Sequence, residues 1–262
     1  MHLLNAISAL IICAGCTALA ADKPVADQPL SAESTVDQIL DALDARGRNL
    51  QAFTADVSLK EEDVTLANES TRRGKVLYQD RGNGNARLRV IFTERDTTKR
   101  IFQEKVEYLL EDGWLTDRTY DPKNIEVRRQ VLRKGEKIDL LKLGEGPFPL
   151  PIGQKKESVH EQFDVKKIPP GKDDPKDVAT VHVQLAPKPG TQFERKFETI
   201  DVWVDTKTHM PARIDTALGE TVRSTLLTNF KVNPEPPLRD ADFTLPAIDK
   251  SKWDFHEEPF AE

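Results

Sequence analysis

The stretch FTADVSLK, residues 53–60, decides the fold class of this chain. Its apolar residues stand at 53, 55, 57 and 59, and its polar residues stand at 54, 56, 58 and 60. Successive side chains of a β-strand point to opposite faces, so a period of two predicts a strand with one buried face. The segment therefore indicates a β-rich fold.

The same alternation recurs along most of the chain. It appears in GKVLY (74–78), ARLRVIF (86–92) and KVEYLL (105–110), with turn sequences at GNGN (82–85) and DG (112–113). Such turns between alternating segments are typical of β-hairpins. Further strand patterns lie at 178–185, 199–205, 211–214 and 222–230. Turn signals roughly every ten residues favour one large antiparallel sheet over several small domains.

A short helix is predicted before the sheet. Apolar residues at 36, 39, 40 and 43 follow helical spacing, either Ser34 or Thr35 can cap the first turn, and the helix is expected to end near Gly47. Residues 21–33, with prolines and small or charged residues, predict a flexible leader. We therefore expect one domain over residues 34–248, followed by a C-terminal tail over 249–262.

The strand pattern breaks between residues 138 and 163, where apolar residues stand among glycines and prolines. We interpret this segment as a proline-bounded flap with an apolar face, followed by a short helix around residues 156–162. A moving lid over a ligand and a static lid packed on the core both fit this pattern. The candidate lid residues are Leu140, Leu141, Leu143, Phe148, Leu150 and Ile152.

Residues 1–20 predict a signal peptide. They contain no Asp, Glu, Lys or Arg, their apolar run is shorter than the roughly 20 residues that span a bilayer, and Ala18-Leu19-Ala20 is a small-x-small cleavage pattern. Cleavage near Ala20 removes both cysteines, Cys13 and Cys16, and leaves no thiol for a disulfide. Lipidation of Cys16, which follows an Ala-Gly pair as in a lipobox, and an uncut membrane anchor stay open as alternatives.

Composition and motifs exclude several function classes. The formal net charge is −6, the pI is near 5.5, and the charged residues are well mixed in sign, so there is no extended basic surface for nucleic acid. The histidines at 160, 182, 209 and 256 form no spaced metal-binding pair. No nucleophile elbow or phosphate-binding glycine loop occurs. We expect no nucleic-acid partner, no metal, no cofactor and no enzymatic activity.

Several short motifs, each a strand with a turn, arrive in a characteristic order. They are LQAFTADV (50–57), RGKVLY (73–78), YLLEDGWL (108–115) with YDP (120–122), VQLAPK (183–188), IDVWVD (200–205) with MP (210–211), and DFTLP (242–246). Their order over most of residues 34–248 resembles that of the periplasmic lipoprotein carrier family, LolA. Charge-rich insertions at Glu94-Arg95-Asp96 and Lys172-Asp173-Asp174 depart from that family and suggest a divergent branch.

The resemblance implies an α+β, mainly β fold, in which a single strongly curved antiparallel sheet forms an incomplete barrel with helices and a flap over its concave face. It also implies an apolar cavity that binds the acyl chains of lipoproteins or lipids. The cavity candidates are Phe53, Val57, Val76, Tyr78, Leu88, Val90, Phe92, Tyr108 and Trp114. Alternation alone does not separate such a cavity from a filled core, because both are lined by the same residue types.

The function implied by the resemblance is that of a periplasmic carrier, a monomer that moves acylated cargo toward the outer membrane and meets inner- and outer-membrane partner proteins. In the family a basic residue after the Gly-x-Leu strand helps control lid closure, and Arg81 is the nearest match. An exposed hairpin arginine explains Arg81 equally well. The alternatives are a membrane-tethered lipid-binding lipoprotein and an envelope-stress regulatory binding module of the same fold.

Overall fold

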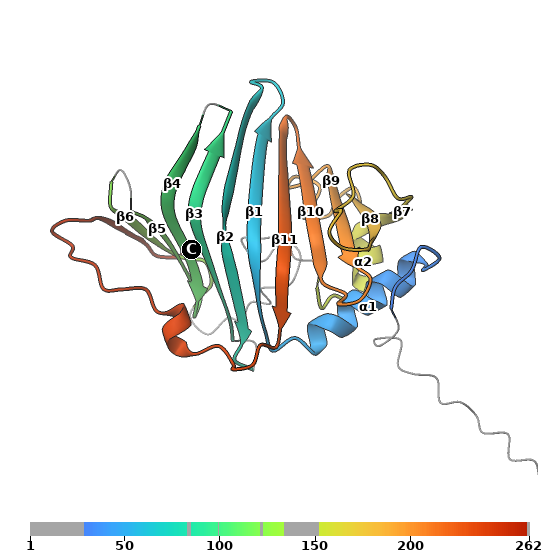
Figure 1. The fold of residues 1–262 in the computed structure, drawn as a ribbon, viewed down its shortest axis with the longest axis horizontal. Coiled ribbons are helices and arrows are strands. Elements are labelled where there is room, and N and C mark those ends of the chain that lie inside the picture. The colour runs from blue at the N-terminus through green and yellow to red at the C-terminus, as the bar shows by residue number, and fades with distance from the viewer. Residues whose placement is uncertain (1–28, 83–84, 99, 121–122, 134–151, 261–262) are drawn as a thin grey trace, which may run out of the picture.

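Twelve strands form one sheet in the computed structural model, which describes residues 29–82, 85–98, 100–120, 123–133 and 152–260 (Figure 1). In chain order they are β1 (Ala52–Asp63), β2 (Asn68–Asp80), β3 (Ala86–Thr97), β4 (Ile101–Glu111), β5 (Trp114–Thr119), β6 (Ile125–Gln130), β7 (Phe163–Ile168), β8 (Thr180–Pro187), β9 (Thr199–Asp205), β10 (Pro211–Leu218), β11 (Thr221–Val232) and β12 (Asp254–Glu258). The order across the sheet is β12-β6-β5-β4-β3-β2-β1-β11-β10-β9-β8-β7.

The sheet is built from two meanders that meet in its centre. Consecutive hairpins link β1 to β6 and β7 to β11, and β1 pairs with β11 from Phe53↔Val232 to Asp63↔Thr221. The edge strands β7 and β12 are not paired with each other, so the sheet does not close. The predicted incomplete barrel, mainly β with helices, is therefore confirmed.

Helix α1 (Val36–Arg48) begins where the sequence predicts it. The Thr35 hydroxyl accepts a hydrogen bond from the Gln38 backbone N–H at 3.2 Å, and the Gln38 side chain accepts one from the Thr35 N–H at 2.8 Å. This reciprocal capping box satisfies two backbone donors of the first turn. Helix α2 (Lys156–Gln162) packs against α1, with Lys156 Nζ 2.8 Å from Asp41 Oδ2. No helix in the described ranges is long and apolar enough to cross a bilayer.

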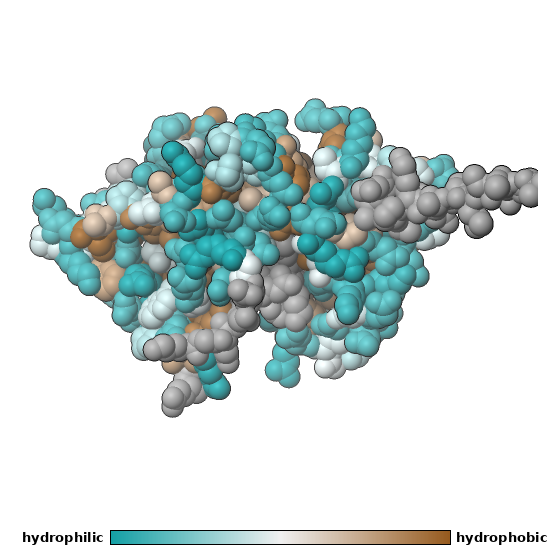
Figure 2. Space-filling model, turned by 90° about the horizontal axis from the view of Figure 1, so that it is seen from below, coloured by the Kyte–Doolittle hydropathy of each residue, from teal (hydrophilic) through white to brown (hydrophobic). Residues whose placement is uncertain are grey.

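The sheet has an inner face and an outer face. The inner face carries the side chains of Phe53, Val76 and Val90, which form one buried cluster with Ile39 and Leu43 of α1. The outer face carries the residues that alternate with these along the strands. Figure 1 places both helices beside the β7–β10 part of the sheet. Seen from below, the molecule shows a mostly hydrophilic surface with hydrophobic residues visible between its polar groups (Figure 2).

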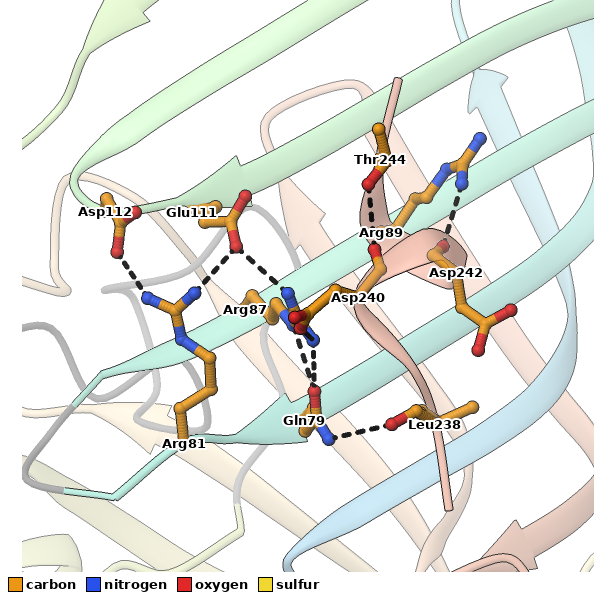
Figure 3. Close-up of polar contacts among 10 residues, drawn as sticks. All are labelled: Gln79, Arg81, Arg87, Arg89, Glu111, Asp112, Leu238, Asp240, Asp242 and Thr244. Atoms are coloured by element: carbon orange, nitrogen blue, oxygen red, sulfur yellow. Dashed lines mark hydrogen bonds and ion pairs between the residues drawn. The ribbon is translucent and has the colours of Figure 1, made fainter. Parts of the chain in front are cut away.

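Residues 234–253, which we call the C-terminal strap, contact outer-face side chains of β2, β3 and β5. Figure 3 shows the part of the strap that lies against β2 and β3. Its 3₁₀ helix η2 (Asp240–Phe243) buries Phe243 beneath the Arg87 guanidinium, 4.1 Å from the ring centre. The Arg89 guanidinium donates to the Asp242 carbonyl at 2.8 Å, and Gln79 donates to the Leu238 carbonyl at 3.3 Å. Two arginines and one glutamine of the sheet thus hold the strap in place.

The chain end differs from the tail predicted over residues 249–262. Residues 254–258 form β12, which pairs in parallel with β6. Two ion pairs join the strands, Arg128–Glu257 at 3.2 Å and Arg129–Glu258 at 2.5 Å. The sequence DFHEE has no apolar alternation because most of this edge strand is exposed, so periodicity cannot identify it. The sheet is therefore antiparallel except for one parallel pair at its edge.

The segment before α1 is attached to the sheet where the structure describes it. Leu30 is buried, and its backbone N–H donates to the Thr206 carbonyl at 2.9 Å. Lys167 on β7 donates to the Ser34 carbonyl at 2.8 Å. The last residues of the predicted leader thus belong to the folded domain. The predicted signal peptide, with Cys16 and Ala20, lies outside the described residues.

Candidate functional site

The apolar residues predicted to line a cavity gather on the inner face, with one exception. Seven of them are almost fully buried there, and Tyr108 is half-buried on the same face. Trp114 lies on the outer face, where its ring packs under the Arg128 guanidinium at 4.9 Å. Its neighbour Leu115 takes the inner side opposite Leu110, so the alternation excludes Trp114 from this surface. The seven buried residues are Phe53, Val57, Val76, Tyr78, Leu88, Val90 and Phe92.

A small apolar cavity lies at the centre of this surface. Its volume is about 10 Å³, enough for roughly one water molecule. Two lining residues, Thr225 and Leu227, come from β11 and are absent from the sequence-based set, because the β1–β11 pairing that brings them there is not a local pattern. The other lining residues are Phe53, Val57, Val76, Leu88 and Val90.

Aromatic rings extend the apolar surface on both sides of the cavity. Phe53 stacks on Tyr78 with ring centres 5.5 Å apart and contacts Phe230 at 6.0 Å. Phe92 meets Tyr108 edge to face at 6.3 Å. Such ring pairs contribute about 1 kcal/mol each beyond the area they bury. The inner face of β1–β4 and β11 is thus one continuous apolar surface.

The inner face becomes charged toward the end of the sheet that carries the β1–β2, β3–β4 and β10–β11 turns, at the top of Figure 1. We call this end the tip end. One cross-strand row there runs Leu59↔Arg72↔Arg95↔Phe102 through β1, β2, β3 and β4. Directly paired residues of antiparallel strands point to the same face, so both arginines face inward with Leu59.

Arg72, a member of this row, contacts two carboxylates, one on β1 and one on β4. Its Nε lies 3.1 Å from Glu104 Oε2, and its Nη1 lies 4.0 Å from Glu61 Oε2. Burial lowers the pKa of the Arg72 guanidinium, but the hydrogen bond and charge of Glu104, with smaller contributions from Tyr108 and Glu61, outweigh burial and raise the pKa. Arg72 is therefore held charged at the border of the apolar surface.

Asp117 is a half-buried carboxyl on the inner face. It lies directly opposite Tyr108, whose partner in turn is Val90. Burial raises the pKa of the Asp117 carboxyl, although the positive charges of Arg129 and Arg72 act in the opposite direction. A neutral carboxyl disturbs an apolar surface less than a charged one, because the charged form loses more hydration.

The residue predicted to control a lid, Arg81, pairs with carboxylates at the β4–β5 turn (Figure 3). Its Nη1 lies 3.0 Å from Glu111 Oε1, and its Nη2 lies 2.7 Å from Asp112 Oδ1. Glu111 also contacts Arg87, so Arg81 joins the network that leads to the strap. Its proposed role in lid closure stays a prediction.

Of the predicted lid residues, only Ile152 lies within the described ranges. It is fully buried, and the next residue, Gly153, donates its N–H to the Leu43 carbonyl of α1 at 3.1 Å. Leu140, Leu141, Leu143, Phe148 and Leu150 lie outside the described residues. Ile152 therefore packs in the core beside α1.

The described part of the chain contains no group of three or more His, Cys, Asp or Glu side chains that could hold a metal ion. The histidines at 160, 182 and 256 each contact a single aspartate, at 37, 201 and 254 respectively, with N–O distances of 2.8–2.9 Å. His182 also stacks on Trp203 with ring centres 4.0 Å apart. These pairs stand on separate elements and form no common site.

No family model matches the chain, and no curated protein matches it. Solved structures that it resembles include a chain of the Pseudomonas aeruginosa MucA/MucB complex, with a TM-score of 0.46 and 11% identity over 80% of this chain and 60% of that one. LprF from Mycobacterium bovis has a TM-score of 0.40 and 12% identity over 74% and 91%. A LolA superfamily protein from Nitrosomonas europaea has a TM-score of 0.33 and 15% identity over 81% and 98%.

A member of the LolA superfamily, which the sequence motifs resemble, is thus among the solved structures that this chain is similar to. The chain spans about 60% of the length of the MucA/MucB chain that it matches. At identities of 11–15%, no binding residue, ligand or partner is transferred from these proteins to this chain.

Proposed function

We propose that this chain is a periplasmic carrier-like protein that binds the acyl chains of lipoproteins or lipids on its inner face and moves them toward the outer membrane. One observation carries the proposal. Apolar side chains from β1, β2, β3, β4 and β11 form a continuous surface on one face of a sheet that is not closed. Acyl chains gain about 0.8 kcal/mol for each methylene removed from water, so such a surface favours them strongly.

Binding requires the inner face to open. The space at its centre, about 10 Å³, is far smaller than an acyl chain, so the side chains around it must separate. An unclosed sheet can widen without breaking its hydrogen bonds, because β7 and β12 are free edges in the sheet order. We therefore expect the ligand to enter by spreading the inner face apart from the helices that pack on it.

Native mass spectrometry of the mature protein purified from its own envelope tests the proposal. We expect a bound species with the mass of a diacyl lipid or an acylated peptide, which denaturing extraction then identifies. Protein that is consistently empty, and that also fails to take up a fluorescent fatty acid, would show that the inner face is a filled core.

Two matched variants locate the binding surface. Val90→Trp fills the cavity on the inner face, whereas Lys75→Trp adds the same side chain to an exposed position on the outer face. We expect Val90→Trp to weaken fatty-acid uptake at least about tenfold and Lys75→Trp to leave uptake unchanged. If Val90→Trp does not fold, as judged by circular dichroism, Leu227→Trp on β11 takes its place. Equal uptake by both tryptophan variants contradicts binding at this surface.

A further inference from the structure

Arg95 is a cation on the inner face with no carboxylate partner among the described residues. It lies in the charge-rich insertion Glu94-Arg95-Asp96, but both flanking carboxylates face outward and pair with Arg73, at 2.7 Å and 3.3 Å. Within the described ranges, the buried Nε of Arg95 has no hydrogen-bond partner, and no ion pair of its guanidinium occurs there.

The neighbourhood of Arg95 adds positive charge. Arg72 lies directly opposite it on β2, and like charges in directly paired positions destabilise a sheet. Glu61 is shared between Arg72 and Arg223, with Arg223 Nε at 2.9 Å, and Glu104 contacts Arg72. Among these five side chains, three guanidinium groups thus face two carboxylates, so one positive charge is in excess. The Asp117 carboxyl, which also senses the charge of Arg72, stands three strands away from it on β5. The excess positive charge occurs in a chain whose formal net charge is −6.

This charge lies at the border of the apolar surface. The next row toward the centre of the sheet contains Val57, Phe92 and Val106, all buried. Beyond the arginines, the tip end carries the exposed side chains of Val64, Leu66 and Ile101. A molecule with its chain on the apolar rows and its head toward the tip end therefore places that head beside Arg72 and Arg95.

We infer that Arg95, with Arg72 beside it, binds the anionic head of the amphiphile whose chain lies on the inner face, which rests on the function proposed above. Guanidinium groups present a planar fork of N–H donors that matches the oxygens of a phosphate or carboxylate. The ligand class is thus an amphiphile with a phosphate or carboxylate head. Its anion neutralises the excess charge and supplies an acceptor for the buried Nε of Arg95.

The test compares dodecyl phosphate, 1-dodecanol and inorganic phosphate as ligands of the full mature chain, by isothermal titration calorimetry. We expect the wild type to bind dodecyl phosphate more tightly than dodecanol. Arg95→Gln is expected to weaken dodecyl phosphate binding about tenfold and to leave dodecanol binding unchanged. Arg95→Lys keeps the charge, so its affinity for dodecyl phosphate is expected to lie between those of the wild type and Arg95→Gln. Arg73→Gln, one strand away on the outer face, is the matched control and should behave as the wild type.

The outcomes separate this inference from the proposed function. If the wild type binds both dodecyl compounds equally and Arg95→Gln changes neither, the inner face binds chains and the head site is refuted. If inorganic phosphate binds as tightly as dodecyl phosphate and is lost in Arg95→Gln, the site is one for free anions and the amphiphile assignment is wrong. If neither dodecyl compound binds, the proposed function and the inference fall together.

Discussion

At the residue scale, Gly74 illustrates how one position sets the shape of the sheet. The register between β2 and β3 shifts at Arg73/Gly74, and a Cβ atom at Gly74 would lie 1.8 Å from the Ile91 carbonyl oxygen. Real side chains do not approach a backbone this closely, so only glycine permits the contact. Such register shifts bend a strand and increase its local twist.

We predict that Gly74→Ala destabilises the protein by about 3 kcal/mol, because the added methyl group must push two strands apart. Thermal unfolding should show a Tm lower by roughly 10 °C. Gly171→Ala is the control, since the nearest atom to its added Cβ is the Asp174 carboxylate oxygen at 3.9 Å. An unchanged Tm for Gly74→Ala would show that the two strands can separate locally at little cost.

The half-buried Asp117 carboxyl is expected to make the stability of the protein depend on pH. Because burial raises the pKa of its carboxyl in the folded protein, the folded state holds this proton more tightly than the unfolded chain does. Below about pH 4, the ordinary pKa of aspartate, the Asp117 carboxyl is protonated in both the folded and the unfolded state and does not reduce the free energy of unfolding. As pH rises through the raised pKa, the folded state must ionise a half-buried group and stability is lost.

Asp117→Asn should therefore raise the Tm at neutral pH by about 2 °C and have no effect below about pH 4. Thermal unfolding at a series of pH values measures the difference between the two proteins. Asp177→Asn, at an exposed position, is the matched control and should show no such pH-dependent gain. A gain for Asp117→Asn that is the same at every pH would exclude ionisation as its cause.

At the element scale, the C-terminal strap is the part of the fold that joins the chain end to the outer face. Its single buried side chain in η2 is Phe243, which lies between the strap and Arg87. A 3₁₀ helix this short has little stability of its own, so its position depends on this contact and on the arginine hydrogen bonds.

Phe243→Ala is expected to cost about 3 kcal/mol and to loosen the strap, because it removes a buried ring and leaves a cavity below Arg87. Thr244→Ala changes an exposed neighbour and should cost about 0.5 kcal/mol or less. Urea unfolding gives both free energies, and limited proteolysis reports whether residues 234–253 become accessible. Equal resistance to protease in the two variants would mean that the strap is held without Phe243.

Helices and strands of this fold also differ in how well the local sequence predicts them. The helical spacing at residues 36–43 and the period of two at residues 53–60 predict α1 and β1 correctly, because both signals depend only on residues close in sequence. The structure shows that Thr35, one of the two predicted caps, caps α1. β12 shows no such signal, since its pairing partner β6 is more than a hundred residues away and its own residues are mostly exposed. Trp114, a predicted cavity residue, lies on the outer face, because alternation near the β4–β5 turn fixes only which residues share a side.

At the scale of the whole molecule, ligand binding and stability are coupled. A ligand that binds only the folded state adds about 2.7 kcal/mol of stability at a free concentration one hundred times its Kd. For a domain of this size, such a gain raises the Tm by roughly 5–10 °C. In the proposed binding mode this gain is smaller, because the packed residues around the small cavity must separate.

We therefore predict that dodecyl phosphate, kept below its micelle concentration, raises the Tm of the wild type by several degrees. Differential scanning calorimetry measures the shift, and the Val90→Trp variant, with its cavity filled, is the control that should show little of it. A lower Tm for the wild type in the presence of the compound would show that it binds the unfolded chain in preference, as a detergent does.

Local sequence patterns predict most of the helices and strands and the side chains that they carry. Strand periodicity, turn residues and the helix cap depend on neighbours in the chain, so they predict α1, most strands and the set of apolar residues on β1–β4. Which of these residues share a surface depends on strand pairing, which is a property of the tertiary structure. The pairing of β1 with β11 brings Thr225 and Leu227 to the cavity, and the register of β2 with β3 sets Arg72 opposite Arg95. Such contacts join residues far apart in the chain, and no local pattern encodes their register.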